Sequence, residues 1–454
     1  MKKGITKNLK NGIIWSAKQY SGAITNTLFV SYISFYATDV LKMSPFLIAT
    51  VLLVTKLFDG VTDIIAGMII DNVRLKGGKG RPYDWCIPFI ALFTILTFSA
   101  PVVNHTLQAV WIGVMYVLTQ AVFNTLLQAA DPIYLLKAFP EEKERNNVFS
   151  VGMVFGQLVS LVMTSIFPIL VAQAGTSHSA WTRIAIIGTA PFALIAMSRF
   201  FLIKEVTIDE KNEGIQINKK QSKVSVLDAL KAIISNRYIL ILTFSIFLIV
   251  ICSGMLNTSA TYYFRYFVGD VKGMSVIGIA SFASLIMLVL FGPLSNRFGK
   301  CNVMKFALAV SLLGNIIRWF GGTNMATIFI GMALMLFGVM PISVYFPLFL
   351  FDIMDYGEWK TGKRVEGILS VFPNFANKVA SGISVSIATF ILGFAGYDGA
   401  VEVQTDAAMR AIDWTFNGIP TILFGVLVIV MFLFYDIDKY MPKVKADLDN
   451  RQVQ

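Results

Sequence analysis

The sequence predicts an all-α membrane protein in which twelve transmembrane helices form two six-helix halves, with both termini in the cytoplasm. Of the 454 residues, 56% are hydrophobic and only 14% are charged, whereas a soluble domain carries roughly a quarter charged residues. Apolar stretches of about 20 residues, the length that crosses a bilayer, recur along the whole chain. Lysine and arginine concentrate in alternate connections between them. This composition argues against a soluble enzyme or a nucleic-acid-binding domain.

The predicted spans follow one another closely except at the centre of the chain. They cover residues 12–38, 44–70, 84–103, 107–131, 148–172, 182–202, 238–264, 272–294, 303–320, 325–351, 367–397 and 413–435. The basic N-terminus is not followed by a short apolar core with a small-residue cleavage site. The first span is therefore expected to be retained as a helix rather than removed as a signal peptide.

The distribution of basic residues predicts the orientation. If both termini are cytoplasmic, the cytoplasmic segments hold 29 of the 38 lysines and arginines, the opposite side holds five, and four lie within or at the ends of spans. Random scatter does not produce such an imbalance, so the net charge of +11 is read as the positive-inside bias of a membrane protein. We expect a multi-pass protein of the cytoplasmic membrane of a bacterium.

A polar stretch in the middle of the chain divides the spans into two sets of six. A weak repeat relates the sets, because the second span of each ends in Gly, three residues, Asp or Asn, and then cations, at Gly67 and Asp71 and again at Gly292 and Asn296. Two related six-helix halves are typical of secondary transporters. The predicted parts are an N-terminal bundle (1–202), a cytoplasmic central loop (203–237), a C-terminal bundle (238–435) and a cytoplasmic tail (436–454).

The residues that enzymes and metal sites need are sparse. Cys86, Cys252 and Cys301 are far apart in the sequence, and His105 and His178 fall in short polar connections. The sequence contains no nucleophile–base pair, phosphate-binding loop or cysteine–histidine metal motif. It therefore predicts no enzyme, no bound cofactor, no nucleic-acid partner and no obligate protein partner.

Ionisable residues inside the second span are the most informative for function. Lys56, Asp59 and Asp63 are spaced three and four apart and so share one helix face, with Thr62 beside them. A charge at the centre of a membrane helix costs about 2.5–3.5 kcal/mol. Two acids one turn apart repel each other, and a bound cation or a proton relieves that repulsion. We predict a Na⁺ or H⁺ site at Asp59, Asp63 and Thr62; the competing interpretation is a structural ion pair with Lys56.

A lysine in the eleventh span is the expected partner of these acids. Lys378 stands in the middle of the span, where a lone cation is costly unless it meets an acid. Asp59 and Asp63 lie at a matching depth. A charge pair between the two halves would then respond to cation binding, with Lys56 as a second member of the set.

Polar residues of the fourth span are candidates for the substrate site. Gln120, Asn124, Gln128 and Asp131 share one helix face. They bind sugar hydroxyls if they face a cavity, or they hold helices together, and the sequence favours neither alternative. The remaining candidates are Lys18, which either favours an acidic sugar or lies at the interface, and Asn374. Arg318, near the end of the ninth span, is expected to snorkel toward the membrane surface.

Three segments resemble a known transporter family. They are Asp59-Gly60-Val61-Thr62-Asp63 with the following Gly67, Asp71, Arg74 and Arg81-Pro82; Asp355-Tyr356-Gly357-Glu358-Trp359-Lys360-Thr361-Gly362-Lys363-Arg364-Val365-Glu366-Gly367; and Lys378. Together with Tyr36-Ala37-Thr38-Asp39, these segments resemble the glycoside–pentoside–hexuronide:cation symporters, the melibiose permease family of the major facilitator superfamily. The resemblance covers essentially the whole chain.

The resemblance implies the major facilitator fold and cation-coupled sugar uptake. It implies that Asp59 and Asp63 bind Na⁺, Li⁺ or H⁺, that Lys378 lies close to them, and that Asn124, Gln128 or Asp131 belongs to the sugar site. The chain departs from melibiose permease at Thr62, where that protein has Asn, which makes H⁺ coupling more plausible. The helix 1 acid is replaced near Ala23, and the helix 5 arginine has no counterpart around 147–152, so galactoside specificity is not carried over.

These observations predict symport of a glycoside, pentoside or uronide with Na⁺ or H⁺ by alternating access. The partners expected are this small sugar and the membrane lipid. The alternatives are a lipid or amphiphile carrier of the same fold and a non-transporting membrane sensor. Two polar clusters are expected to latch the halves at a cytoplasmic gate, and their members are Asp71, Arg74, Arg81, Tyr356, Glu358 and Arg364.

Overall fold

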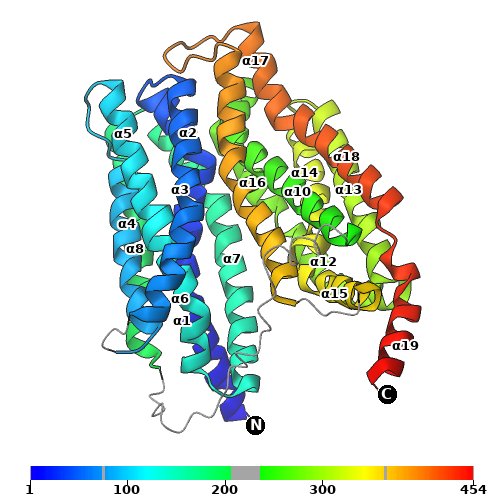
Figure 1. Ribbon diagram of the computed structural model, residues 1–454. Helices are drawn as coiled ribbons and strands as arrows, with labels where there is room; N and C mark the ends of the chain where they lie inside the picture. The colour runs from blue at the N-terminus through cyan, green and yellow to red at the C-terminus, as the bar shows by residue number, and fades with distance from the viewer. Residues whose placement is uncertain (1, 74–76, 206–235, 362–365, 453–454) are drawn as a thin grey trace. The chain divides into compact units, whose positions relative to one another are not determined.

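The structure is a computed structural model that describes residues 2–73, 77–205, 236–361 and 366–452. Side chains are described in these ranges except at 2–6, 57, 59–61, 63–64, 71–72, 142–143, 344, 347, 361, 366–372, 374–375 and 449–452. All the secondary-structure elements assigned in the described residues are helices (Figure 1). The all-α prediction is therefore confirmed.

The N-terminal helices lie at the positions that the apolar windows predict. In chain order they are α1 (Lys2–Thr27), continued through π-helical turns at Leu28–Tyr32 and Tyr36–Val40 that flank α2 (Ile33–Phe35); α3 (Pro45–Asn72); a 3₁₀ turn at Arg81–Trp85 leading into α4 (Cys86–Thr97); α5 (His105–Tyr116), joined by a π-helical segment at Val117–Asn124 to α6 (Thr125–Ala138); α7 (Glu142–Ala174); and α8 (His178–Leu202).

The C-terminal helices follow the same pattern. They are α10 (Arg237–Tyr263) with π-helical Phe264–Val268; a 3₁₀ turn at Val271–Met274 before α11 (Ser275–Ala280) and α12 (Ala283–Phe298); α13 (Lys300–Phe320); α14 (Met325–Val344); α15 (Phe346–Thr361); α16 (Glu366–Phe394); α17 (Asp406–Asp413) with π-helical Trp414–Gly418 leading into α18 (Ile419–Phe434); and a 3₁₀ turn at Ile437–Lys439 before α19 (Met441–Gln452).

A helical run overlaps each predicted span, and nine runs in the described part are long and apolar enough to cross a membrane. The count of twelve crossings, the orientation and the division into four parts remain predictions. One predicted span, 325–351, is broken in the structure at Tyr345, between α14 and α15. Pro347 follows two residues later, and a proline has no backbone N–H to donate to the carbonyl four residues before it, so the helical hydrogen-bond pattern is interrupted here.

The chain packs as two units, which we describe separately. The first comprises the described residues of Met1–Ile215, Ala260–Gly278 and Val385–Ala411, and the second those of Gln216–Ser259, Ile279–Ser384 and Ile412–Gln454. The segment predicted as a cytoplasmic central loop lies outside the described residues for most of its length, at 206–235.

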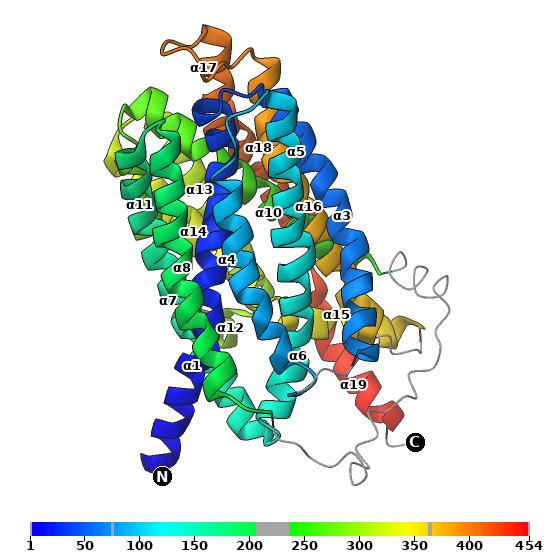
Figure 2. The same cartoon turned by 90° about the vertical axis from the view of Figure 1, so that its left-hand side faces the viewer.

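In the first unit, α1 packs against α7 and α8, α4 packs against α8, and α3 lies beside the α5–α6 run (Figures 1 and 2). An aromatic cluster joins one end of these helices. Trp181 is fully buried, stacks on Phe98 at 5.9 Å between ring centroids, and contacts Tyr36 at 5.6 Å. Large buried aromatic rings contribute much of the apolar area of a core, so this cluster fixes the ends of α1, α4 and α8 together.

In the second unit, α13 and α14 approach each other through glycines. A Cβ added at Gly338 would stand 2.0 Å from the Ala307 carbonyl oxygen, and one at Gly314 would stand 2.5 Å from the Gly331 carbonyl oxygen. No side chain fits at either position without moving a backbone. This close approach is the packing that small residues allow between membrane helices.

The prediction that Arg318 snorkels is wrong. Its side chain is fully buried, and its guanidinium donates to the Asn417 side-chain oxygen at 2.9 Å, to the Asn315 side-chain oxygen at 3.0 Å and to the Phe416 carbonyl at 2.8 Å. Phe416 belongs to the π-helical segment Trp414–Gly418. The polar groups collected at this segment give the cation interior partners, so it has no need to reach the membrane surface.

Gly338→Ala tests the close packing of α13 and α14. We expect the melting temperature in detergent to fall, because the added methyl group must displace the Ala307 backbone, and overpacking of this kind costs about 1–3 kcal/mol. Gly425→Ala in α18 is the matched control, since a Cβ there meets nothing within 4 Å. That variant should keep or raise the melting temperature because alanine favours helix. Equal melting temperatures for the two variants would contradict the packing described.

Candidate functional site

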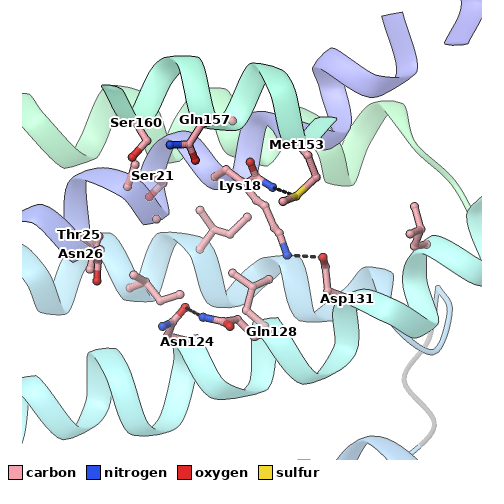
Figure 3. Close-up of a pocket in the computed structure, with 18 of the residues that line it drawn as sticks. Lys18, Ser21, Thr25, Asn26, Asn124, Gln128, Asp131, Met153, Gln157 and Ser160 are labelled. Atoms are coloured by element: carbon pink, nitrogen blue, oxygen red, sulfur yellow. Dashed lines mark hydrogen bonds and ion pairs between the residues drawn. The ribbon is translucent and has the colours of Figure 1, made fainter. Parts of the chain in front are cut away.

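The first unit contains a cavity of about 610 Å³ (Figure 3). Its walls come from α1, from the α5–α6 run, from α7 and from two isoleucines of α4, Ile87 and Ile90. These isoleucines belong to a buried apolar cluster that joins α4 to α6 and α8. The volume lies within the roughly 300–1,000 Å³ of small-molecule sites. The cavity is therefore large enough for a small ligand and is held by packed helices.

A ladder of amide side chains lines one wall. The Asn124 amide donates to the Gln120 side-chain oxygen at 3.0 Å, and the Gln128 amide donates to the Asn124 side-chain oxygen at 3.2 Å. A spacing of four residues stacks the three side chains on one helix face, as the sequence predicts. Each amide offers two donors and two acceptor lone pairs, and the ladder uses only some of them. The remaining groups can bind a ligand.

An ion pair stands at one end of the cavity. Lys18 of α1 pairs through Nζ with Oδ2 of Asp131 on α6, and both residues line the cavity (Figure 3). The structure thus brings all the predicted helix 4 candidates and the helix 1 candidate Lys18 around one space. The remaining substrate candidate is Asn374 of α16, whose side chain lies outside the described residues.

Two further charged residues, Arg199 and Asp84, extend this ion pair into the protein interior. Oδ1 of Asp131 accepts from Nη1 of Arg199 at 2.6 Å, and Nε of Arg199 donates to Oδ2 of Asp84 at 3.0 Å while Nη2 pairs with Oδ1. The side chains of Arg199 and Asp84 are 1% and 0% exposed. Two bases and two acids alternate along this charge chain, Lys18–Asp131–Arg199–Asp84. Its formal charges sum to zero, which is what a buried site requires.

Local structure holds Arg199 in place. It lies in the last turn of α8, with its guanidinium 4.7 Å from the Trp15 ring and 5.0 Å from the Tyr134 ring. The Tyr134 hydroxyl donates to the Ile203 carbonyl at 2.8 Å, which satisfies backbone at the helix end. Sequence reasoning missed Asp84 and Arg199, since each stands at the end of an apolar window, where charges are common. Only the packing of α4, α6 and α8 shows that they meet.

The structure describes the side chains of only some of the predicted cation-binding and charge-pair residues. The Thr62 hydroxyl donates to the Phe58 carbonyl of its own helix at 3.0 Å, and Lys56 Nζ lies 5.5 Å from the centre of the Tyr116 ring. The side chains of Asp59 and Asp63 lie outside the described residues. Lys378 is an exposed residue of α16 in the second unit. The cation site and the charge pair with Lys378 remain predictions.

The predicted gate residues lie in both units. Arg81 donates from Nε to the Phe200 carbonyl at 2.8 Å, and its guanidinium stands 4.5 Å from the Phe200 ring. In the second unit, Tyr356 packs edge-on against Tyr238 at 4.9 Å, and Glu358 is partly buried on the same helix. Arg74, Arg364 and the side chain of Asp71 lie outside the described residues. The gate also remains a prediction.

A buried carboxylate was not predicted as a functional group. Asp39, at the end of the first helical run, is fully buried in the first unit. It accepts from Arg265 at 2.7 Å, from Tyr397 at 2.8 Å and from the Thr38 hydroxyl at 2.7 Å. The contact with Arg265 gives this interior acid a cationic partner.

The sequence is similar to those of known transport proteins. Residues 20–439 match the sequence model of the family described as MFS/sugar transport protein. The chain is 29% identical to the isoprimeverose transporter of Lactiplantibacillus pentosus, over 98% of this chain and 93% of that protein. It is 25% identical to the glucuronide carrier protein homolog of Escherichia coli strain K12, over 92% and 90%. It is 24% identical to that strain's putative glycoside/cation symporter YagG, over 96% and 92%.

Solved structures show the same fold at low sequence identity. The nucleoside transporter NupG matches with a TM-score of 0.63 and 14% identity, over 94% of this chain and 99% of that one. A bacterial homolog of the human lysosomal transporter Spinster matches with a TM-score of 0.65 and 11% identity, over 98% and 99%. These likenesses concern the fold alone.

Arg199→Gln tests the charge chain. We expect a clear fall in the melting temperature, because the change leaves the buried Asp84 carboxylate without its cation, and breaking a buried pair in this way costs about 3–5 kcal/mol. Adding Asp84→Asn should recover part of the loss, since it removes the uncompensated charge. Lys439→Gln is the control: this lysine is 78% exposed and stands 3.9 Å from Asp436, so its loss should have little effect. If the melting temperature of Arg199→Gln equals that of Lys439→Gln, Arg199 does not stabilise the protein by neutralising Asp84.

Proposed function

The chain belongs to the MFS/sugar transport protein family, and on this premise we propose that it carries a sugar together with a cation across the cell membrane by alternating access. The observation that carries the proposal is a cavity with polar and charged side chains in its walls, inside an apolar helical unit. Amide groups and an ion pair line it, and a sugar requires such groups to replace the water that its hydroxyls lose. The protein is a multi-pass membrane transporter and not an enzyme.

The polar groups in the lining favour a sugar over the alternative amphiphile. A lipid chain needs an apolar surface, whereas the α5–α6 wall presents the ladder of three amides and the carboxylate of Asp131. The similar proteins named as transporters or carriers of isoprimeverose, glucuronides and glycosides support the same class. We assign Asn124, Gln128, Asp131 and Lys18 to the sugar site. A non-transporting sensor would show no flux of any of these sugars.

We place the coupling cation at Asp59, Asp63 and Thr62. The three residues occupy adjacent turns of α3, and two acids on one face need a cation or a proton to relieve their repulsion. One lysine, Lys56, cannot neutralise both acids. Lys378 and the gate residues Asp71, Arg74, Arg81, Tyr356, Glu358 and Arg364 would then couple cation binding to the exposure of the site. An inward cation gains about 2.3 kcal/mol per 100 mV, which exceeds the 1.4 kcal/mol of a tenfold concentration ratio.

Uptake into proteoliposomes under imposed gradients tests the coupling. We expect accumulation of labelled isoprimeverose or of a labelled glycoside only when an inward Na⁺ or H⁺ gradient is applied. The gradient that drives accumulation identifies the ion. Equal accumulation with and without either gradient would contradict symport. The empty-liposome background is the control.

Asp59→Asn and Asp63→Asn test the cation site. We expect each variant to lose gradient-driven accumulation by at least tenfold while retaining exchange of sugar across the membrane, because the amide cannot bind the cation or titrate. Glu402→Gln, which changes an exposed acid, is the matched control and should accumulate sugar normally. Normal accumulation by the double variant Asp59→Asn/Asp63→Asn would remove the site from the mechanism.

A further inference from the structure

The charged residues that line the cavity bear on the charge of the sugar that it can hold. Resting on the proposed function, we infer that the substrate is an uncharged, hydroxyl-rich sugar, and that the Ser21 and Thr25 hydroxyls of α1 bind it together with the amide ladder. A uronide or a sulfonated sugar is then a poor ligand. The family does not settle this choice, because similar proteins carry names of both neutral and acidic sugars.

The charges at the cavity are already matched. Lys18 and Asp131 are its charged lining residues among those described, one of each sign, and they pair with each other. Asp131 cannot release Lys18 cheaply, because its other oxygen is held at 2.6 Å by Arg199, which in turn holds the buried Asp84. An anionic sugar would have to displace Asp131 from Lys18 and place a second negative charge beside it. The carboxylate of Asp131 and the anionic group of the sugar would then repel each other strongly, because a site that excludes water screens charges poorly.

Two buried hydroxyls at the cavity lack partners among the described residues. Ser21 and Thr25 are each 3% exposed and line the cavity one helical turn apart. Their hydroxyl oxygens have no hydrogen-bond partner among the residues that the structure describes. Thr27 of the same helix, by contrast, donates to the Ala23 carbonyl at 2.8 Å. A buried polar group left unsatisfied costs about 1–3 kcal/mol, and a bound ligand hydroxyl removes that cost.

The other polar side chains that the structure describes at the cavity are neutral hydroxyls and amides. Ser21 and Thr25 stand on α1, and Asn124 and Gln128 stand on the α5–α6 run (Figure 3). Hydroxyls and amides both donate and accept, which matches sugar hydroxyls, since these also do both. A carboxylate or sulfonate only accepts. The cavity therefore offers mixed neutral partners from two walls to a neutral polyol.

Ser21→Ala and Thr25→Val test the hydroxyl assignment. The probes are isoprimeverose and the matched pair p-nitrophenyl β-D-glucopyranoside and p-nitrophenyl β-D-glucuronide, which differ in charge at one carbon. We expect the neutral sugars to be transported and the glucuronide to compete poorly. Each variant should raise KM for the neutral sugar about threefold to tenfold, as expected for one lost hydrogen bond. The melting temperature without ligand should be unchanged or higher, because an unsatisfied group is removed.

Thr27→Val is the matched control, on the same helix but outside the cavity lining, and should leave KM unchanged. Unchanged KM in both Ser21→Ala and Thr25→Val would overturn the hydroxyl assignment. Transport of the glucuronide in preference to the neutral sugars would overturn the charge assignment and leave sugar symport standing. Absence of flux for every probe, under both ion gradients, would overturn the proposed function itself and this inference with it.

Asp131→Asn tests the charge argument in the binding step alone. The substitution leaves Lys18 without its carboxylate, so we expect the glucuronide to bind at least tenfold more tightly relative to its neutral partner than it does to the unchanged protein. Competition binding in detergent measures this ratio without requiring transport. An unchanged ratio would show that the Lys18–Asp131 pair does not set the preference for charge.

Discussion

The structure of the first unit depends on one constraint: a charge inside a membrane protein needs a partner inside the same protein. Lys18, Asp131, Arg199 and Asp84 meet it as a chain of alternating sign. Because its members come from α1, α6, α8 and the turn before α4, the chain ties four elements together at one end of the cavity. Removing any one of these residues would leave the charge of an adjacent residue without its partner. The charge chain therefore holds the helices that form the cavity walls in position.

Acids in or beside the predicted spans of this protein fall into two kinds. Asp39 has partners from the protein in this structure, with Arg265, Tyr397 and Thr38 all donating to it. Its charge is balanced here by side chains of the chain itself. Asp59 and Asp63, in the function that we propose, are the opposite case. Their charge is answered by an ion that comes and goes, which is what a coupling site requires.

A neutral sugar has a consequence for energetics. If the substrate brings no charge and the cavity is already neutral, the coupling ion alone carries charge through the membrane. The full membrane potential then acts on each transport cycle. A uronide moving with one cation would cancel that charge and leave only the concentration gradients. The match of charges at Lys18 and Asp131 thus bears on the driving force as well as on recognition.

The sequence by itself determined the helices, their all-α class, the shared face of Gln120, Asn124, Gln128 and Asp131, and, through its motifs, the family. These features are local, because hydropathy and helix period act over tens of residues at most. Pairings between helices are not local. Asp131 and Arg199 are 68 residues apart, and Arg199 and Asp84 are 115 apart. Only tertiary packing decided that these residues meet, that Arg318 turns inward, and which hydroxyls of α1 are left for a ligand, since each depends on the distance between side chains of different helices.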